Sequence, residues 1–175
     1  MACTRPDTDG KGRLVCVARL LMAPLTFSHV GVCVSDLEQS TTFYTRALGF
    51  QELFTVELGA EVAATMEIEG RFTSRMLNRG DVRVELLHWI EPMARGERSR
   101  RPMNEFGMTH LCFRVENIDD LFVVAEQSGG RVHRETLSVI EGAGVDGGPV
   151  KTVYLSDPDG VRIECISGTP ELVSP

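Results

Sequence analysis

The sequence VRVE at Val82–Glu85 returns as VRIE at Val161–Glu164, 79 residues later. A second repeat accompanies it, because the pair SH at 28–29 returns as TH at 109–110, 81 residues later. The chain is therefore expected to contain one structural module built twice. Each copy opens with a histidine and carries a glutamate in a later strand-like run. Two histidines and two glutamates at matched positions are the nitrogen and oxygen ligands that a divalent metal site needs.

Composition narrows the class of protein. A length of 175 residues with 42% hydrophobic residues suits one domain or two small units that share a core. The formal net charge of −7 argues against a general nucleic-acid role, which requires a basic surface. No run approaches the ~20 apolar residues of a transmembrane helix, so no membrane contact is expected.

Cysteine usage predicts a reducing compartment. The five cysteines show no C-x-x-C motif and no disulfide-framework spacing. A cytoplasmic location with free thiols is therefore expected.

The first module has a readable order of elements. Residues 27–34 alternate, so the valines are expected on one face of a strand and His29 on the other. A helix follows, with Ser35 and Glu38 as its capping box and Gly49 as its stop. Strands are expected at 50–56, 72–78 and 82–89, while 57–68 fits either a short helix or an irregular strand.

The second module repeats that order. Residues 108–115 alternate with His110, Cys112 and Arg114 on one face. Asn117 is the expected N-cap of a helix that ends at Gly129 and Gly130. Strands are expected at 131–137, 151–155 and 161–167, with a turn at 157–160 before the last.

The expected fold class is α+β, with two paired βαβββ modules forming a curved mixed sheet of about eight strands and helices on the convex face. Five segments are expected: an N-terminal extension at 1–24, a first module at 25–90, a linker or lid loop at 91–107, a second module at 108–168 and a C-terminal tail at 169–175.

The remaining histidines invite structural interpretations. His88 has the opposite parity to Glu85, which predicts a surface or edge position, and His133 is expected to be a solvated strand residue. Each glutamate of the repeats could instead pair with a neighbouring arginine, Arg83 or Arg162.

The chain resembles the vicinal oxygen chelate superfamily, which includes glyoxalase I, methylmalonyl-CoA epimerase, extradiol dioxygenases and bleomycin-resistance proteins. The likeness covers roughly residues 25–168. It rests on the motifs quoted above together with FY at 43–44, LGF at 48–50, VELL at 84–87, GMTH at 107–110 and DPDGVRIE at 157–164. The resemblance implies paired modules, a small-molecule substrate, one divalent metal ion in the cup (Ni, Co, Zn, Mn or Fe) and a homodimer.

Carried over residue by residue, the resemblance implies four metal ligands: His29, Glu85, His110 and Glu164. Glu164 is the first choice for the catalytic base and Glu85 the second. Glyoxalase I enzymes usually carry an arginine four residues after the first histidine, where this chain has Cys33. The matching residue of the second module is Arg114, which could take over that role. The expected substrate contacts are Arg114, Cys33, Arg101 from the arginine-rich linker, and Lys151.

The function implied is that of a glyoxalase I-like lyase or isomerase. The metal would polarise a carbonyl as an enolate develops, and a carboxylate would move the proton, on a small carbonyl substrate or its thiol or CoA conjugate. An iron(II) extradiol dioxygenase is one alternative, and a non-catalytic small-molecule binding protein of the resistance type is another. Whether the site closes within one chain or across a dimer stays open at this point.

Overall fold

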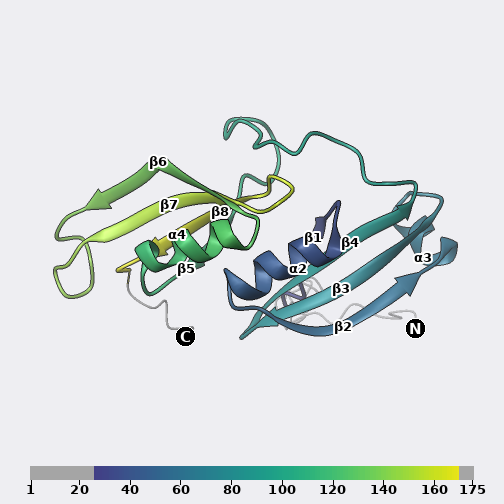
Figure 1. Ribbon diagram of the computed structural model, residues 1–175, viewed down its shortest axis with the longest axis horizontal. Helices are drawn as coiled ribbons and strands as arrows, with labels where there is room; N and C mark the ends of the chain where they lie inside the picture. The colour runs from purple at the N-terminus through teal and green to yellow at the C-terminus, as the bar shows by residue number, and fades with distance from the viewer. Residues whose placement is uncertain (1–25, 170–175) are drawn as a thin grey trace, which may run out of the picture.

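The computed structural model describes residues 26–169, so the predictions for the N-terminal extension and for most of the C-terminal tail lie outside the described residues. Two modules follow one another along the chain (Figure 1). The first contains β1 (Val30–Cys33), α2 (Leu37–Arg46), β2 (Gln51–Leu58), α3 (Ala60–Thr65), β3 (Arg71–Arg79) and β4 (Val82–Glu91). The second contains β5 (Leu111–Arg114), α4 (Ile118–Gln127), β6 (Arg131–Ile140), β7 (Val150–Ser156) and β8 (Arg162–Ser167).

The two sheets have the same topology. Their strand orders are β1-β4-β3-β2 and β5-β8-β7-β6, and in each sheet the first pair is parallel and the others antiparallel. The α+β class and the paired βαβββ modules are confirmed. The eight strands form two separate four-stranded sheets rather than one continuous sheet. Within residues 26–169, β1 and β5 each have a strand partner on one side only.

Both modules share one hydrophobic core. Phe43 and Tyr44 from α2 belong to the same buried cluster as Ile118 and Leu121 from α4, and strand residues of both sheets complete it. The two helices lie near each other at the centre of the molecule, one over each sheet (Figure 1). The core face of each sheet is therefore the face that its own helix covers.

The turn before β8 ties the modules together. The buried Asp157 carboxylate accepts hydrogen bonds from the backbone N–H groups of Asp159 and Val161, and it also accepts one from the Tyr44 hydroxyl at 3.2 Å. Asp159 Oδ2 accepts from the Ser35 backbone N–H at 2.9 Å. Burial raises the pKa of Asp157 to about 6, because a desolvated carboxylate favours its neutral form.

The sequence signals for helix starts predicted one N-cap correctly and one wrongly. Asn117 caps α4 as predicted, with Oδ1 accepting from the Asp119 backbone N–H. The prediction of Ser35 as the cap of α2 is wrong, because Asp36 occupies that position and accepts from the Gln39 backbone N–H. The ambiguous stretch at 57–68 contains the short helix α3. No helix within the described part of the chain is long and apolar enough to span a membrane.

Candidate functional site

The first histidine–glutamate pair sits where β1 runs parallel to β4. Gly31 is the register partner of Glu85, which places His29, just ahead of β1, next to that carboxylate. His29 Nε2 lies 3.2 Å from Glu85 Oε2. Ser28 Oγ lies 2.9 Å from His29 Nδ1, and the Ser74 hydroxyl donates to Glu85 Oε1 at 2.5 Å. We call these four side chains the first half-site.

The second pair has the same construction on β5 and β8. Cys112 is the register partner of Glu164, and His110 Nε2 lies 2.9 Å from Glu164 Oε2. Thr109 Oγ1 lies 2.9 Å from His110 Nδ1, and the Thr152 hydroxyl donates to Glu164 Oε1 at 2.9 Å. These four side chains, from residues 109, 110, 152 and 164, form the second half-site.

The donor chemistry of both half-sites fits a divalent metal. When the neighbouring hydroxyl accepts a hydrogen bond from Nδ1–H, the proton of the neutral imidazole is on Nδ1. Nε2, the atom that faces the carboxylate, then keeps its free lone pair. The second hydroxyl fixes the far oxygen of that carboxylate, and such outer contacts orient metal ligands in proteins. Each half-site thus offers one nitrogen and one oxygen donor, and two half-sites together supply the four donors of a typical N/O site.

The two half-sites do not meet within one chain. Val84 and Leu86 flank Glu85 and are fully buried in the shared core, as are Ile163 and Cys165 beside Glu164. Because side chains alternate along a strand, both glutamates lie on the sheet face that points away from α2 and α4. Within residues 26–169, no group of three or more His, Cys, Asp or Glu side chains lies close enough to hold a metal ion. The predicted quartet is therefore present as two pairs.

The surroundings of the first half-site are apolar. Leu87 and Trp89 follow Glu85 on the same face of β4, and they pack with Phe72 of β3 and Ala63 of α3 in a second, smaller buried cluster. Phe72 and Trp89 have ring centroids 4.8 Å apart. Helix α3, which the sequence left ambiguous, closes this cluster beside the ligand pair.

Polar groups surround the second half-site. The Tyr154 ring stands edge-on to His110 with centroids 5.7 Å apart. Burial raises the pKa of Tyr154, and the Glu164 carboxylate adds to that shift. The Cys112 thiol is exposed on the same face, and its pKa is raised first by burial and then by Glu164. Both neighbours therefore stay protonated at neutral pH and can donate hydrogen bonds.

The four predicted substrate contacts lie in different places. Cys33 is exposed at the end of β1, and its pKa is raised by burial and by Asp159. Arg101 donates to the backbone carbonyls of Phe106 and Met108, so it holds the linker ahead of His110. Lys151 forms a 3.0 Å ion pair with Asp119 at the start of α4. Lys151 shares a face with the buried Val153, and this helix-side position gives no support to a contact at Glu164.

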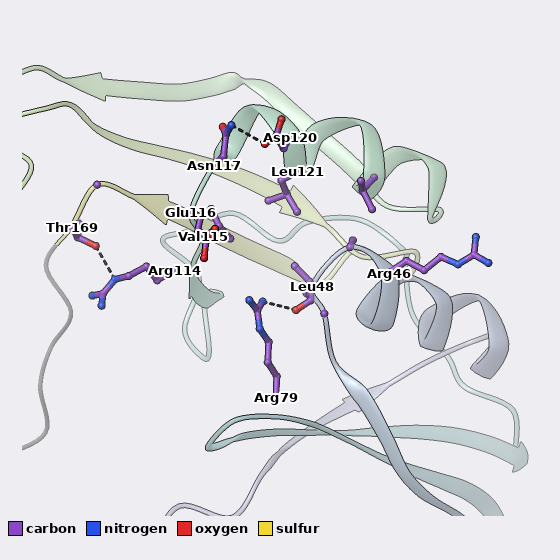
Figure 2. A pocket seen from close by; sticks show the side chains of 14 residues that line it. Arg46, Leu48, Arg79, Arg114, Val115, Glu116, Asn117, Asp120, Leu121 and Thr169 are labelled. Atoms are coloured by element: carbon purple, nitrogen blue, oxygen red, sulfur yellow. Dashed lines mark hydrogen bonds between the residues drawn. The ribbon is translucent and has the colours of Figure 1, made fainter.

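Arg114 lines a different cavity. A cleft of about 1000 Å³ opens between the end of α2 and the start of α4. Figure 2 shows Arg114 there with its guanidinium directed toward Thr169, to which Nε donates at 2.9 Å. Arg79 enters the same cleft and donates to the Leu48 carbonyl at 2.5 Å. This cleft thus contains none of the four predicted metal ligands, and two of its arginines, Arg79 and Arg114, are engaged by the protein itself.

Sequence reasoning missed two polar residues beside the glutamates. Ser74 and Thr152 support the glutamates, and only the register of the neighbouring antiparallel strands reveals that contact. The prediction that His133 is solvated is wrong, because it is 4% exposed and pairs with Ser156 at 2.8 Å. The sequence predicted that His133 lies on a strand. It could not predict that residues of the linker lie near its side chain.

Comparison with known protein families identifies the superfamily of this chain. The family model described as the Glyoxalase/Bleomycin resistance protein/Dioxygenase superfamily matches residues 26–165. The chain belongs to this superfamily. Members of this superfamily bind small-molecule substrates and a divalent metal ion.

Individual relatives are distant but cover most of the chain. Mitochondrial methylmalonyl-CoA epimerase from Bos taurus is 28% identical over 138 residues, which span 78% of this chain and 71% of the relative. Lactoylglutathione lyase from Salmonella typhimurium is 29% identical over 143 residues, spanning 79% and 89%. A solved glyoxalase family protein from Bacillus cereus has the same fold, with a TM-score of 0.70, 19% identity and coverage of 85% and 97%.

Proposed function

We propose that this protein is a metal-dependent lyase or isomerase that moves a proton next to a carbonyl group, and that its site forms between two copies of the chain. The first half-site of one copy would face the second half-site of the other. The observation that carries the proposal is the matched construction of two half-sites, each with two metal-ligating atoms and each incomplete alone.

The free sheet edges support assembly across a dimer. β1 and β5 carry the histidines close to their starts, and each lacks a strand neighbour on its outer side within the described residues. Phe27 and Met108, two residues before each histidine, are 69% and 57% exposed. Pairing these edges around a two-fold axis would join two sheets of four strands and bury both apolar side chains.

A divalent cation held by His29, Glu85, His110 and Glu164 would supply Lewis-acid polarisation of the substrate carbonyl and acidify the neighbouring C–H bond. Glu164 would accept that proton on a carboxylate oxygen and return it to the same or the adjacent carbon. The Thr152 hydroxyl holds Oε1 of this carboxylate at 2.9 Å and so orients the base. Glu85 has the equivalent support from Ser74 and is the second candidate.

The substrate proposed is a small carbonyl compound bound as a thiol or CoA conjugate. This proposal draws on the names of the relatives, an epimerase of a CoA thioester and a lyase of a glutathione conjugate. Leu87, a partly exposed residue at the edge of the apolar cluster, would contact the acyl group, because it presents carbon surface next to Glu85.

The test is exchange of the substrate proton with solvent. Protein loaded with Mn, Co, Ni or Zn is incubated in D₂O with methylmalonyl-CoA or with the hemithioacetal of glutathione and methylglyoxal, and deuterium uptake is followed by NMR. Glu164→Gln should slow exchange by about 10²–10⁴-fold at saturating metal, the usual contribution of a positioned base. Glu141→Gln, a change of an exposed carboxylate in the turn after β6, is the matched control. Unchanged exchange in Glu164→Gln would remove this residue as the base.

A further inference from the structure

Two adjoining hollows lie beside the second half-site, under the linker. One, of about 280 Å³, is lined by His110 together with Arg100, Arg101 and Arg162. The other, of about 360 Å³, is lined by Arg98, Arg100, Arg131, His133 and Ser156. Ser99, Arg100 and Gly160 line both hollows. None of these arginines is a metal ligand in the proposed site.

The arginines here are incompletely neutralised. Arg100 is a quarter exposed, and its nearest carboxylate oxygen, on Glu135, is 3.6 Å away. Burial lowers the pKa of Arg100, and the positive charges of Arg162 and Arg131 lower it further. Arg162 donates to the Arg101 carbonyl, and Arg131 has no ion pair with any carboxylate among residues 26–169. Three guanidinium groups therefore repel one another in a chain whose net charge is −7.

His133 adds an unused buried donor to this cluster. Its side chain is 5% exposed and its Nε2 is 2.8 Å from Ser156 Oγ. Its Nδ1 has no hydrogen-bond partner within the described residues, and Glu135 Oε1 is 3.4 Å away. Burial lowers the pKa of His133, and the positive charge of Arg100 lowers it further. A bound anion would reverse the second effect and give the ring a partner.

Two of the four nearby acids are engaged elsewhere, whereas Glu97 lines a hollow and Glu135 lies 3.6 Å from Arg100 and 3.4 Å from His133 Nδ1. Both oxygens of Asp157 accept hydrogen bonds from Tyr44, Asp159 and Val161. Asp159 pairs with Arg98 at 3.4 Å and accepts from Ser35. Glu97 lines the hollow nearer His110, within a linker whose own arginines outnumber it. The excess positive charge is thus concentrated at Arg100, Arg131 and Arg162.

We propose that Arg100, Arg131, Arg162 and His133 form a subsite for a phosphate group carried on the tail of the substrate. This inference rests on the proposed function, since it places the reacting carbonyl at His110 and the phosphate in the hollow beyond Arg100. A phosphate monoester or diphosphate matches three guanidinium groups better than one carboxylate does, because it brings more charge and more acceptor oxygens. The subsite would favour CoA thioesters over glutathione conjugates.

The test measures binding directly. Isothermal titration calorimetry on the metal-loaded protein is run with CoA, pantetheine, inorganic pyrophosphate and glutathione. We expect CoA to bind tighter than pantetheine, which lacks the phosphates. Arg100→Gln and Arg131→Gln should each weaken CoA and pyrophosphate binding by about tenfold or more, the value of one charge-assisted hydrogen bond. Pantetheine binding should not change in either variant. Arg71→Gln, an exposed arginine paired with Glu57 in the first module, is the matched control.

Equal affinity of CoA and pantetheine, or CoA binding that is unchanged in both arginine variants, would overturn the subsite. Arginine-dependent binding of pyrophosphate with no gain for CoA would overturn the assignment to the substrate tail. The proposed reaction stands or falls separately on proton exchange in Glu164→Gln. If CoA binding depends on the arginines but the substrate proton does not exchange with solvent, the result would support the phosphate subsite and contradict the proposed reaction.

Discussion

The two half-sites have the same histidine–glutamate pair and differ in what surrounds it. Beside Glu85 the sheet face continues into Leu87, Trp89 and Phe72, which are apolar and packed under α3. Beside Glu164 it continues into Tyr154 and Cys112, with arginines of the linker over the adjoining hollows. The two modules therefore carry matching histidine–glutamate pairs in different surroundings.

In the proposed site between two copies, this difference would give the site a direction. One wall would be apolar and the other cationic. A substrate with a small acyl group at one end and an anionic tail at the other would fit in one orientation only. The metal would then stand at the junction, where the polarity changes.

The largest expected effect tests whether both halves hold the metal. His29→Ala and His110→Ala should each reduce metal affinity by about 10²–10³-fold, since structural sites with four ligands bind with about 10–16 kcal/mol, or roughly 2.5–4 kcal/mol per ligand. Calorimetric titration with Zn²⁺ or Co²⁺ measures this. His88→Gln is the control, because its side chain is on the opposite face of β4 from Glu85. A loss in His110→Ala alone would show that the first half-site is not part of the metal site.

The next effect concerns Asp157, in the turn that ties the two modules together. Because the folded-state pKa of Asp157 is raised to about 6 from 3.8, the folded protein binds the proton more tightly than the unfolded chain does. The free energy of unfolding should therefore fall as pH rises from about 4 to about 6, by up to about 3 kcal/mol from this group. Asp157→Asn, which can keep the turn hydrogen bonds, should remove that slope.

Urea denaturation at several pH values measures this prediction. Asp81→Asn, in the exposed hairpin turn between β3 and β4, is the control and should retain the slope. A difference between Asp157→Asn and the parent protein that is constant between pH 4 and 6 would contradict the account of this junction.

The smaller effect compares the supports of the two glutamates. Ser74→Ala and Thr152→Ala each delete the hydroxyl that donates to one glutamate. Each should weaken metal binding by about 10–100-fold, the usual cost of losing an outer partner of a ligand. Similar losses in the two variants would show that the halves contribute equally. No loss in Ser74→Ala would mean that Glu85 is held by β4 alone.

The repeat could be predicted from sequence because it is written in local patterns. Alternation at 27–34 and 108–115 gave the strands, and Asn117 gave a helix start, since these signals act over a few residues. The ligand pairs were predicted from matched spacing, and the structure brings each pair to within 3.2 Å. These local patterns could not predict how the two histidine–glutamate pairs are arranged relative to each other.

That relation depends on long-range packing. Whether two βαβββ modules join through sheet edges or through helices is decided by Phe43, Tyr44, Ile118 and Leu121 meeting in one core, which periodicity cannot show. His133 illustrates the same limit, because residues of a linker distant in sequence line the same hollow as its side chain. The cap of α2 failed for a local reason, since Ser35 and Asp36 are both good caps and only the backbone decides between them.

The central claim is that a complete site needs a first half-site and a second half-site from different copies. Differently tagged His29→Ala and Glu164→Gln chains are co-expressed, and the heterodimer is purified through both tags. One of its two sites combines the intact halves of both chains, so the account predicts about half of the wild-type exchange rate per dimer, while each parent homodimer is inactive. A heterodimer as inactive as its parents would contradict the claim.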